Sequence, residues 1–305
     1  MRVRVVDGGL STALEEAGHQ LGDRLWTARL LIDDPEAIVG AHLAFLRAGA
    51  RVLITSSYQA SEAGFVSAGL APADAVATLR STTSLAVEAR RRFAVEEPVG
   101  ARDVLVAASV GPYGAALGDG SEYRAPVVDE CTLVEFHTAR LRLLVDTQPD
   151  MLAIETISST REARAIGRAL DGLTPIPAWM SFTCRDGTTT WGGDPIEEVV
   201  AAAVANPSVV AVGVNCTAPA DIAPLLERIS RVTDLPLVAY PNGGQSWDAV
   251  EKVWTGAAAG FSGEDVATCV GLGARYVGGC CGVGPGGIAA LSDELGRTDS
   301  TLAAG

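Results

Sequence analysis

Short apolar runs and longer segments of helical period alternate along the whole chain. The apolar runs are rich in Val, Ile and Leu and are bounded by Gly, Pro or polar residues, which is typical of strands buried on both faces. They predict strands at 3–6, 52–55, 104–109, 151–155, 178–183, 209–215, 237–240 and 276–279. The segments that follow them predict helices at 36–48, 73–93, 130–146, 161–170, 196–205, 222–232, 263–273 and 285–295.

Strands that are each followed by a helix, eight times over, predict an α/β fold of the (β/α)8 or TIM barrel type. A chain of 305 residues suits this barrel as one unit. Since no internal repeat, charge block or proline-rich linker divides the chain, we expect residues 1–305 to form a single barrel domain. The connections 8–35 and 241–262 are long, so we expect lid or binding loops there.

Composition excludes several classes of protein. Hydrophobic residues make up 48% of the chain, which supplies a sizeable core and excludes a disordered protein. The net charge of −14 repels phosphate backbones and anionic membranes, so we expect neither nucleic acid nor a membrane as partner. The chain has no signal-peptide pattern, no apolar run long enough to span a bilayer and only 6 Cys, which predicts a cytoplasmic protein with free thiols.

Histidine and lysine are scarce, which argues against a multi-histidine metal centre or a lysine Schiff base. The only lysine is Lys252. We expect the histidines to be structural or surface residues and three of the cysteines to serve packing. These residues are His19, His42, His137, Cys131, Cys184 and Cys269.

The remaining cysteines lie where a barrel carries its active site, at the carboxyl ends of strands. Cys216 ends the sixth predicted strand, and Cys280 and Cys281 end the eighth. Because adjacent strand residues point to opposite faces, the last two thiols converge only if the chain leaves strand geometry, which the flanking glycines allow. Three thiolates favour Zn²⁺ and leave one tetrahedral position open. Small buried hydrophobes or a redox dithiol are the alternatives.

Two acids and two tyrosines also follow predicted strands. Glu155 ends the fourth strand, where a carboxylate is costly to bury without a cation, so it predicts contact with a substrate amine. Asp7 precedes two glycines and has a similar interpretation, since the glycine amides suit an anionic group. A helix cap or loop hydrogen bond is the alternative for both acids. Tyr58 and Tyr113 offer aromatic faces to a sulfonium or ammonium, or serve ordinary loop packing.

Taken together, these segments resemble the homocysteine S-methyltransferase family, a zinc- and thiol-dependent group that includes betaine-homocysteine methyltransferase. The resemblance covers essentially the whole chain. It is carried by DGG at 7, DRLWTARLL from 23, TSSYQAS from 55, SVGPYGAALGDGSEYR from 109, ET at 155, VGVNC ending at 216, VAYPN ending at 242 and GGCCG from 278. Within the family, SYQAS, GPYGA and DGSEYR are most similar to the short bacterial and plant enzymes that use S-methylmethionine or S-adenosylmethionine.

The resemblance implies a reaction and its residues. A methyl group passes from a sulfonium donor to the thiol of homocysteine, giving methionine. The implied Zn²⁺ ligands are Cys216, Cys280 and Cys281, which form the catalytic set together with Glu155. The implied substrate-binding set is Asp7, Gly8, Tyr58, Glu155 and Asn215, with Tyr58 near the methyl donor.

Three other functions stay open at this stage. A cobalamin-linked methionine synthase is disfavoured because the chain has no Asp-x-His-x-x-Gly stretch and ends soon after Cys281. A betaine-using enzyme is disfavoured because the chain lacks the C-terminal extension that such enzymes use to oligomerise, and a monomer or weak homodimer is expected instead. A non-catalytic zinc or thiol sensor on the same barrel predicts metal binding without turnover.

Overall fold

An eight-stranded parallel sheet forms the centre of the computed structural model, which describes residues 2–21, 27–244, 246–248, 253–255 and 261–302. Its strands are Arg4–Val5 (β1), Val52–Ile54 (β2), Leu105–Val110 (β3), Met151–Ile157 (β4), Ala178–Phe182 (β5), Val209–Asn215 (β6), Leu237–Tyr240 (β7) and Ala274–Val277 (β10). They are ordered β1-β10-β7-β6-β5-β4-β3-β2. A parallel bridge between Val6 and Val52 joins the two edges, so the predicted (β/α)8 barrel is confirmed.

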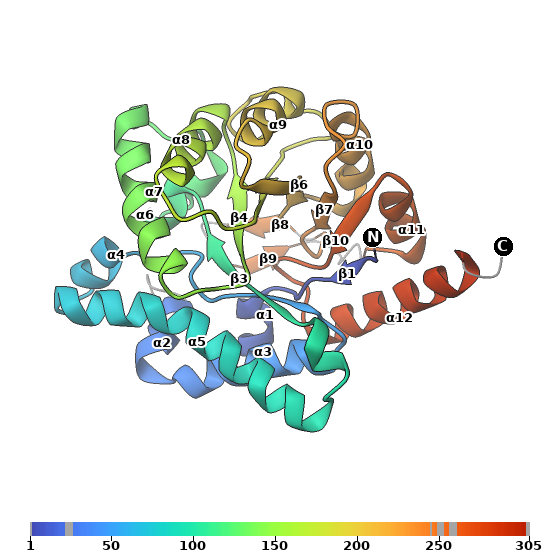
Figure 1. Ribbon diagram of the computed structural model, residues 1–305, viewed down its shortest axis with the longest axis horizontal. Helices are drawn as coiled ribbons and strands as arrows, with labels where there is room; N and C mark the ends of the chain where they lie inside the picture. The colour runs from blue at the N-terminus through green and yellow to red at the C-terminus, as the bar shows by residue number, and fades with distance from the viewer. Residues whose placement is uncertain (1, 22–26, 245, 249–252, 256–260, 303–305) are drawn as a thin grey trace.

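Helices surround the barrel on its outside (Figure 1). Those that follow the barrel strands are Pro35–Arg47 (α3), Pro72–Glu96 (α5), Glu130–Val145 (α7), Thr160–Asp171 (α8), Ile196–Val204 (α9), Pro219–Ile229 (α10), Gly263–Gly271 (α11) and Pro285–Leu302 (α12). Each corresponds to a predicted helix, and α12 is longer than predicted. No helix in the described ranges is long and apolar enough to cross a membrane.

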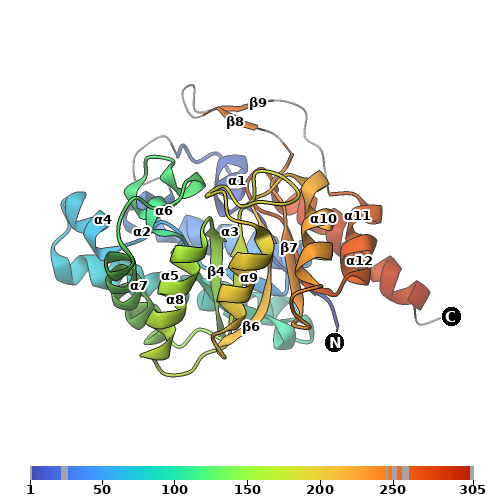
Figure 2. The ribbon, with the colours of Figure 1, turned by 90° about the horizontal axis from the view of Figure 1, so that it is seen from above.

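Smaller elements lie in the connections. They are the helices Leu10–Glu16 (α1), Thr27–Asp33 (α2), Glu62–Ser67 (α4) and Tyr113–Leu117 (α6), the short 3-10 helices Gly100–Asp103 (η1) and Ser121–Tyr123 (η2), and the strands Ser246–Asp248 (β8) and Val253–Thr255 (β9). In β8 and β9 the antiparallel register places Trp247 opposite Trp254, and Figure 2 shows this hairpin standing out from the barrel. Residues 245, 249–252 and 256–260 lie outside the described residues, so the lid expected at 241–262 stays a prediction.

The barrel interior is filled by side chains that alternate along each strand. On β4, Met151 and Ala153 point inward, while Leu152 and Ile154 pack against the helices. Fully buried Trp179 occupies the middle of the interior, with its ring 6.1 Å from that of Tyr240 and 5.5 Å from that of Tyr276. The Tyr240 hydroxyl donates a hydrogen bond to Glu155 at the carboxyl end of β4, and this bond connects the barrel core with the candidate site.

Candidate active site and metal centre

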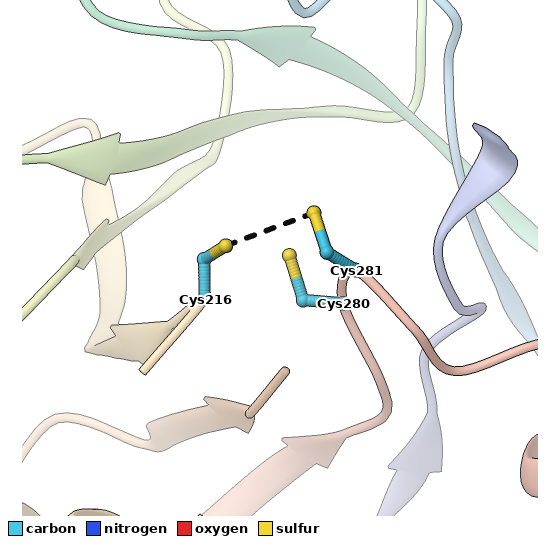
Figure 3. A group of neighbouring side chains, drawn as sticks. All are labelled: Cys216, Cys280 and Cys281. Atoms are coloured by element: carbon cyan, nitrogen blue, oxygen red, sulfur yellow. Dashed lines mark hydrogen bonds between the residues drawn. The ribbon is translucent and has the colours of Figure 1, made fainter. Parts of the chain in front are cut away.

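Three cysteine side chains meet at the carboxyl end of the barrel and point toward one another (Figure 3). The sulfur atoms of Cys216, Cys280 and Cys281 all lie within 4.8 Å of one another, and those of Cys216 and Cys281 are 3.8 Å apart. A tetrahedral site with Zn–S bonds of about 2.3 Å places its sulfurs about 3.8 Å apart. This thiol cluster therefore fits a metal ion, and it is the one such group of Cys, His, Asp or Glu in the described part of the chain.

Local backbone geometry brings the thiols together. β10 ends at Val277, earlier than predicted, so the chain has left strand geometry before it reaches Cys280, as the convergence of two adjacent thiols requires. The Cys280 amide donates to the carbonyl of Pro241 at 2.7 Å, which anchors this turn to the end of β7. Cys216 has a φ of +47°, in the left-handed region that residues other than glycine seldom occupy. Its strained backbone re-aims the thiol after β6.

Charge within the thiol cluster favours one thiolate at a time. Hydrogen bonds from Cys280 and Cys281 lower the pKa of Cys216 well below its ordinary value. Hydrogen bonds with Cys216 and Cys281 raise the pKa of Cys280, and burial and the charge on Cys216 raise it further. All three thiols ionise together only with a cation between them, so the cluster suits a metal ion.

Tyr123, on η2, extends the cluster. Its hydroxyl oxygen lies 3.4 Å from the Cys216 sulfur, and its ring packs edge-on against Trp191 with centroids 5.8 Å apart. Sequence reasoning missed this residue, although DGSEYR carried part of the resemblance. The signal available was a polar and aromatic pair, Glu122 and Tyr123, in the connection after β3. Tyr123 is therefore a hydrogen-bonding neighbour of a candidate metal ligand.

Glu155 is a buried carboxyl group held from two sides. It is 6% exposed and accepts hydrogen bonds from the Ser109 hydroxyl and, at 3.2 Å, from the Tyr240 hydroxyl. Burial raises its pKa to about 7, although both hydrogen bonds lower it, and a charge on Cys216 raises it further. Among the described residues no cationic side chain lies within ion-pair distance of it. Glu155 therefore presents a fixed carboxyl group that lacks a cation.

Asn215, at the end of β6, fixes the backbone beside Glu155. Its Oδ1 accepts from the Thr156 amide and the Ser181 hydroxyl, both at 2.8 Å, and its Nδ2 donates to the Thr156 hydroxyl at 2.8 Å. Thr156 has a φ of +62°, and the pairing of β4 with β5 shifts register after Ile154. Nδ2 also lies 4.0 Å from the Cys280 sulfur. The Asn215 side-chain amide thus connects the positive-φ backbone at Thr156 with the thiol cluster.

Asp7 and Gly8 follow β1 at the same end of the barrel. Asp7 Oδ2 accepts from the Ile54 amide at 2.9 Å, while Oδ1 is buried without a partner. Burial raises the pKa of Asp7 well above its ordinary value, and the charge of Glu155 raises it further. A Cβ atom at Gly8 would lie 2.2 Å from the Val283 carbonyl oxygen, so only glycine allows this turn. One acceptor oxygen is left for a ligand.

The two candidate aromatic faces differ. Burial raises the pKa of Tyr58, and the charges of Glu122, Cys216 and Glu155 raise it further. The Tyr58 phenol therefore interacts electrostatically with the candidate site residues. Tyr113 instead packs its ring edge-on against Phe136, with centroids 5.1 Å apart. Ordinary packing therefore accounts for Tyr113.

The other cysteines and the histidines lie apart from the thiol cluster. Cys184 and Cys269 are buried, as predicted, but Cys131 is exposed near the start of α7, so its assignment to packing is wrong. His42 and His137 are fully buried on α3 and α7. Within the described residues, none of these side chains joins a second group suited to a metal.

Comparison with known proteins agrees with this geometry. The sequence profile of the homocysteine S-methyltransferase family matches residues 4–295. The chain is 41% identical over 299 residues to the homocysteine S-methyltransferase of Escherichia coli K12, covering 95% of this chain and 94% of the relative. It is 42% identical over 301 residues to homocysteine S-methyltransferase 4 of Zea mays, covering 94% and 88%. The metallated form of the homocysteine methyltransferase MmuM from E. coli superimposes with a TM-score of 0.86 at 38% identity, covering 96% of both chains. The chain belongs to the homocysteine S-methyltransferase family.

Proposed function

We propose that this protein transfers a methyl group from a sulfonium donor, S-methylmethionine or S-adenosylmethionine, to the thiol of homocysteine and so forms methionine. The observation that carries the proposal is the thiol cluster of Cys216, Cys280 and Cys281 beside the buried carboxyl group of Glu155. Membership of the family and the likeness to a metallated relative support it. We propose that residues 1–305 act as one barrel domain, in a monomer or weak homodimer.

Zn²⁺ is the metal that best suits the thiol cluster. The three candidate ligands are sulfur atoms, whereas hard cations such as Mg²⁺ and Ca²⁺ bind mainly to oxygen. The Cys216 and Cys281 sulfurs are 3.8 Å apart, which suits a tetrahedral zinc. When bound, zinc supplies a fourth position at which the pKa of a substrate thiol falls, so that the sulfur is nucleophilic at neutral pH.

Two carboxyl groups of the chain suit the ammonium group of homocysteine. Asp7 keeps one buried oxygen without a partner, and Glu155 is fixed by Ser109 and Tyr240. The charge of Glu155 raises the pKa of Asp7, so the two groups interact electrostatically at the same end of the barrel. Gly8 keeps the turn after β1 close-packed beside them. Asn215 positions Thr156, next in sequence to Glu155, and so orders this side of the site.

The transfer itself needs correct placement more than acid–base chemistry. The homocysteine sulfur forms a bond to the methyl carbon while the donor S–CH₃ bond breaks, and that bonding pair stays on the donor sulfur as a neutral thioether. A cation and an anion neutralise each other in this step, so a site shielded from water favours it. The Tyr58 ring offers an aromatic face to the sulfonium, and that contact weakens as the positive charge disappears.

Methionine formation tests the proposal directly. Zinc-loaded protein is given homocysteine with S-methylmethionine, S-adenosylmethionine or betaine, each separately and under reducing conditions. We expect turnover with a sulfonium donor, loss of turnover on chelation and recovery with added zinc. Turnover with betaine alone would contradict the proposed donor class. Zinc binding without turnover from any donor would indicate a sensor on the same barrel.

A further inference from the structure

A buried arginine on α7 joins the two loops that follow β2 and β3. Arg140 is 3% exposed. Its Nη1 donates to the Gly111 carbonyl at 3.0 Å, and its Nη2 donates to the Tyr58 carbonyl at 2.5 Å and to the Ser57 carbonyl. Three carbonyls from two loops therefore converge on one planar guanidinium. A lysine, which has a single donor atom, does not match that geometry.

The surroundings of Arg140 show that it is not held as half of an ion pair. In the described part of the chain no carboxylate lies within ion-pair distance of it, and its Nε has no hydrogen-bond partner. Burial lowers the pKa of Arg140 to about 10, although the charges of Tyr58, Glu155 and Glu162 raise it, so it stays cationic at neutral pH. A buried charge costs stability compared with an apolar side chain of similar size. The guanidinium offsets this cost through its hydrogen bonds, which join the loop after β2 to the loop after β3.

Arg140 binds the backbone of Tyr58 and also the backbone of Gly111, against which the Tyr58 ring packs. A Cβ atom at Gly111 would lie 2.8 Å from two ring carbons of Tyr58 and 2.5 Å from its carbonyl oxygen. The Tyr58 ring thus lies directly on the Gly111 backbone, and both carbonyls belong to the set that Arg140 binds. The position of the ring follows from this clamp, which consists of Arg140, Gly111 and the Tyr58 backbone.

A second polar side chain on the same face of α7 supports the same loop. His137 lies one turn before Arg140, and its Nε2 is 2.9 Å from Glu162 Oε1. That oxygen also accepts the Tyr113 amide at 2.5 Å. Both side chains are buried, so α7 bonds the loop after β3 directly through Arg140 and indirectly through His137, by way of Glu162 on α8.

We propose that Arg140 is a positioning residue that fixes the Tyr58 ring against Gly111 and thereby sets the affinity of the site for its sulfonium donor. The inference rests on the proposed function, in which Tyr58 faces the donor. Arg140 itself touches no substrate in this scheme, because all of its bonded partners are backbone carbonyls.

Steady-state kinetics of Arg140→Lys separates this role from a general structural one. We expect the KM for the sulfonium donor to rise roughly tenfold or more, as for the loss of hydrogen bonds to a charged group. The KM for homocysteine and the zinc content should stay within about twofold of the wild-type values, because the acceptor side and the metal ligands lie outside the clamp. Arg142→Lys, at an exposed position of the same helix, is the matched control and should leave all three values unchanged.

A double-mutant cycle tests whether Arg140 acts through Tyr58. If it does, Arg140→Lys should raise the donor KM less than about twofold in a Tyr58→Ala background. Additive effects, or equal losses of donor affinity, homocysteine affinity and zinc, would overturn the inference. Gly111→Ala keeps the test decisive if Arg140→Lys does not fold. It displaces the ring while leaving the guanidinium in place, so it should reproduce the donor defect, and an unchanged donor KM would also overturn the inference.

Hydrogen exchange provides a measurement that is independent of turnover. In Arg140→Lys, amides at 57–60 and 111–115 should exchange faster than in the wild type, while those of β6 should not change. If the wild-type protein transferred no methyl group from any donor, the proposed function would fail, but exchange would still decide the positioning role. Unchanged exchange at both loops would refute it.

Discussion

Cys216 joins the candidate metal centre to the barrel backbone, and its removal tests the centre most directly. Its thiol is the most acidic of the thiol cluster, so Cys216→Ala removes the ligand that ionises first. We expect zinc retention and turnover to be lost together while the barrel stays folded, because the site lies at the functional end of the strands. Metal analysis after gel filtration, circular dichroism and the methionine assay measure these effects. Cys184→Ala, at a buried cysteine outside the cluster, should keep both properties. Full activity in Cys216→Ala would exclude the mechanism.

Substitution of Glu155 distinguishes a role in homocysteine binding from a role in metal binding. Glu155→Gln keeps the shape and the hydrogen-bonding capacity beside Ser109 and Tyr240 but removes the negative charge. We expect zinc content to be unchanged and the KM for homocysteine to rise by roughly tenfold or more, as for one lost charged hydrogen bond. Titration calorimetry with homocysteine and metal analysis distinguish the two effects. Zinc loss in this variant would show that Glu155 supports the metal instead.

Tyr123 is expected to tune the metal centre through the Cys216 sulfur. Tyr123→Phe removes the hydroxyl that lies 3.4 Å from this sulfur but keeps the ring against Trp191. Loss of such a neighbour typically weakens metal binding by about 10- to 100-fold. Competition with a chromophoric chelator measures the change. Tyr113→Phe is the matched control, since that ring is explained by its packing on Phe136. Equal zinc affinity in the two variants would mean that the Tyr123 hydroxyl does not act on the metal.

At the scale of elements, the barrel strands and their helices were predictable from the alternation of short apolar runs with longer segments of helical spacing. The strands are buried on both faces, so they read as continuous apolar runs, and the main helices are amphipathic. α1, α2, α4 and α6 span only five to seven residues, too few to repeat an apolar stripe over several turns, and the β8–β9 hairpin has no clear alternation. β10 ends before its glycines because the turn at Cys280 is fixed by a contact with Pro241, which no local pattern shows.

The candidate site residues that the sequence revealed are those whose place follows from the barrel pattern. Cys216, Cys280 and Glu155 lie at or near strand ends, and barrel topology converts that position in the sequence into proximity in space. Tyr123 and Arg140 lie on a short helix and on α7, far from those strand ends in the sequence. Their hydrogen bonds depend on how loops and helices pack, so the pattern of the chain does not reveal them.

For the whole molecule, net charge and site charge agree with the proposed donor class. The chain carries −14, and its site holds two buried carboxyl groups and a thiol cluster. S-methylmethionine carries a sulfonium, an ammonium and one carboxylate, so it is a net cation, whereas betaine is neutral overall. A negative field concentrates the cation near the site mouth and gives the neutral donor no comparable advantage. Salt should therefore weaken the apparent affinity for the sulfonium donor.

The stability of the whole barrel should depend on pH through His42. This side chain is fully buried on α3, and neither ring nitrogen has a hydrogen-bond partner. Burial lowers the pKa of His42 from 6.5 to about 4. Between these values the unfolded chain binds a proton at this histidine and the folded chain does not, so acid favours unfolding. The free energy of unfolding should fall by about 3 kcal/mol from this group as the pH drops from neutral toward 4.

Glu155 and Asp7 act in the opposite direction, because their raised pKa values let the folded protein take up protons before the unfolded chain does. The contribution of His42 is therefore isolated by comparing the wild type with His42→Leu in denaturant titrations at several pH values. The variant should gain stability relative to the wild type as the pH falls below 6.5, because leucine cannot be protonated in the unfolded chain. His19→Leu, at an incompletely buried histidine, is measured alongside as a control for the loss of an imidazole. Parallel pH curves for the wild type and His42→Leu would show that His42 is protonated as readily in the folded barrel as in the unfolded chain.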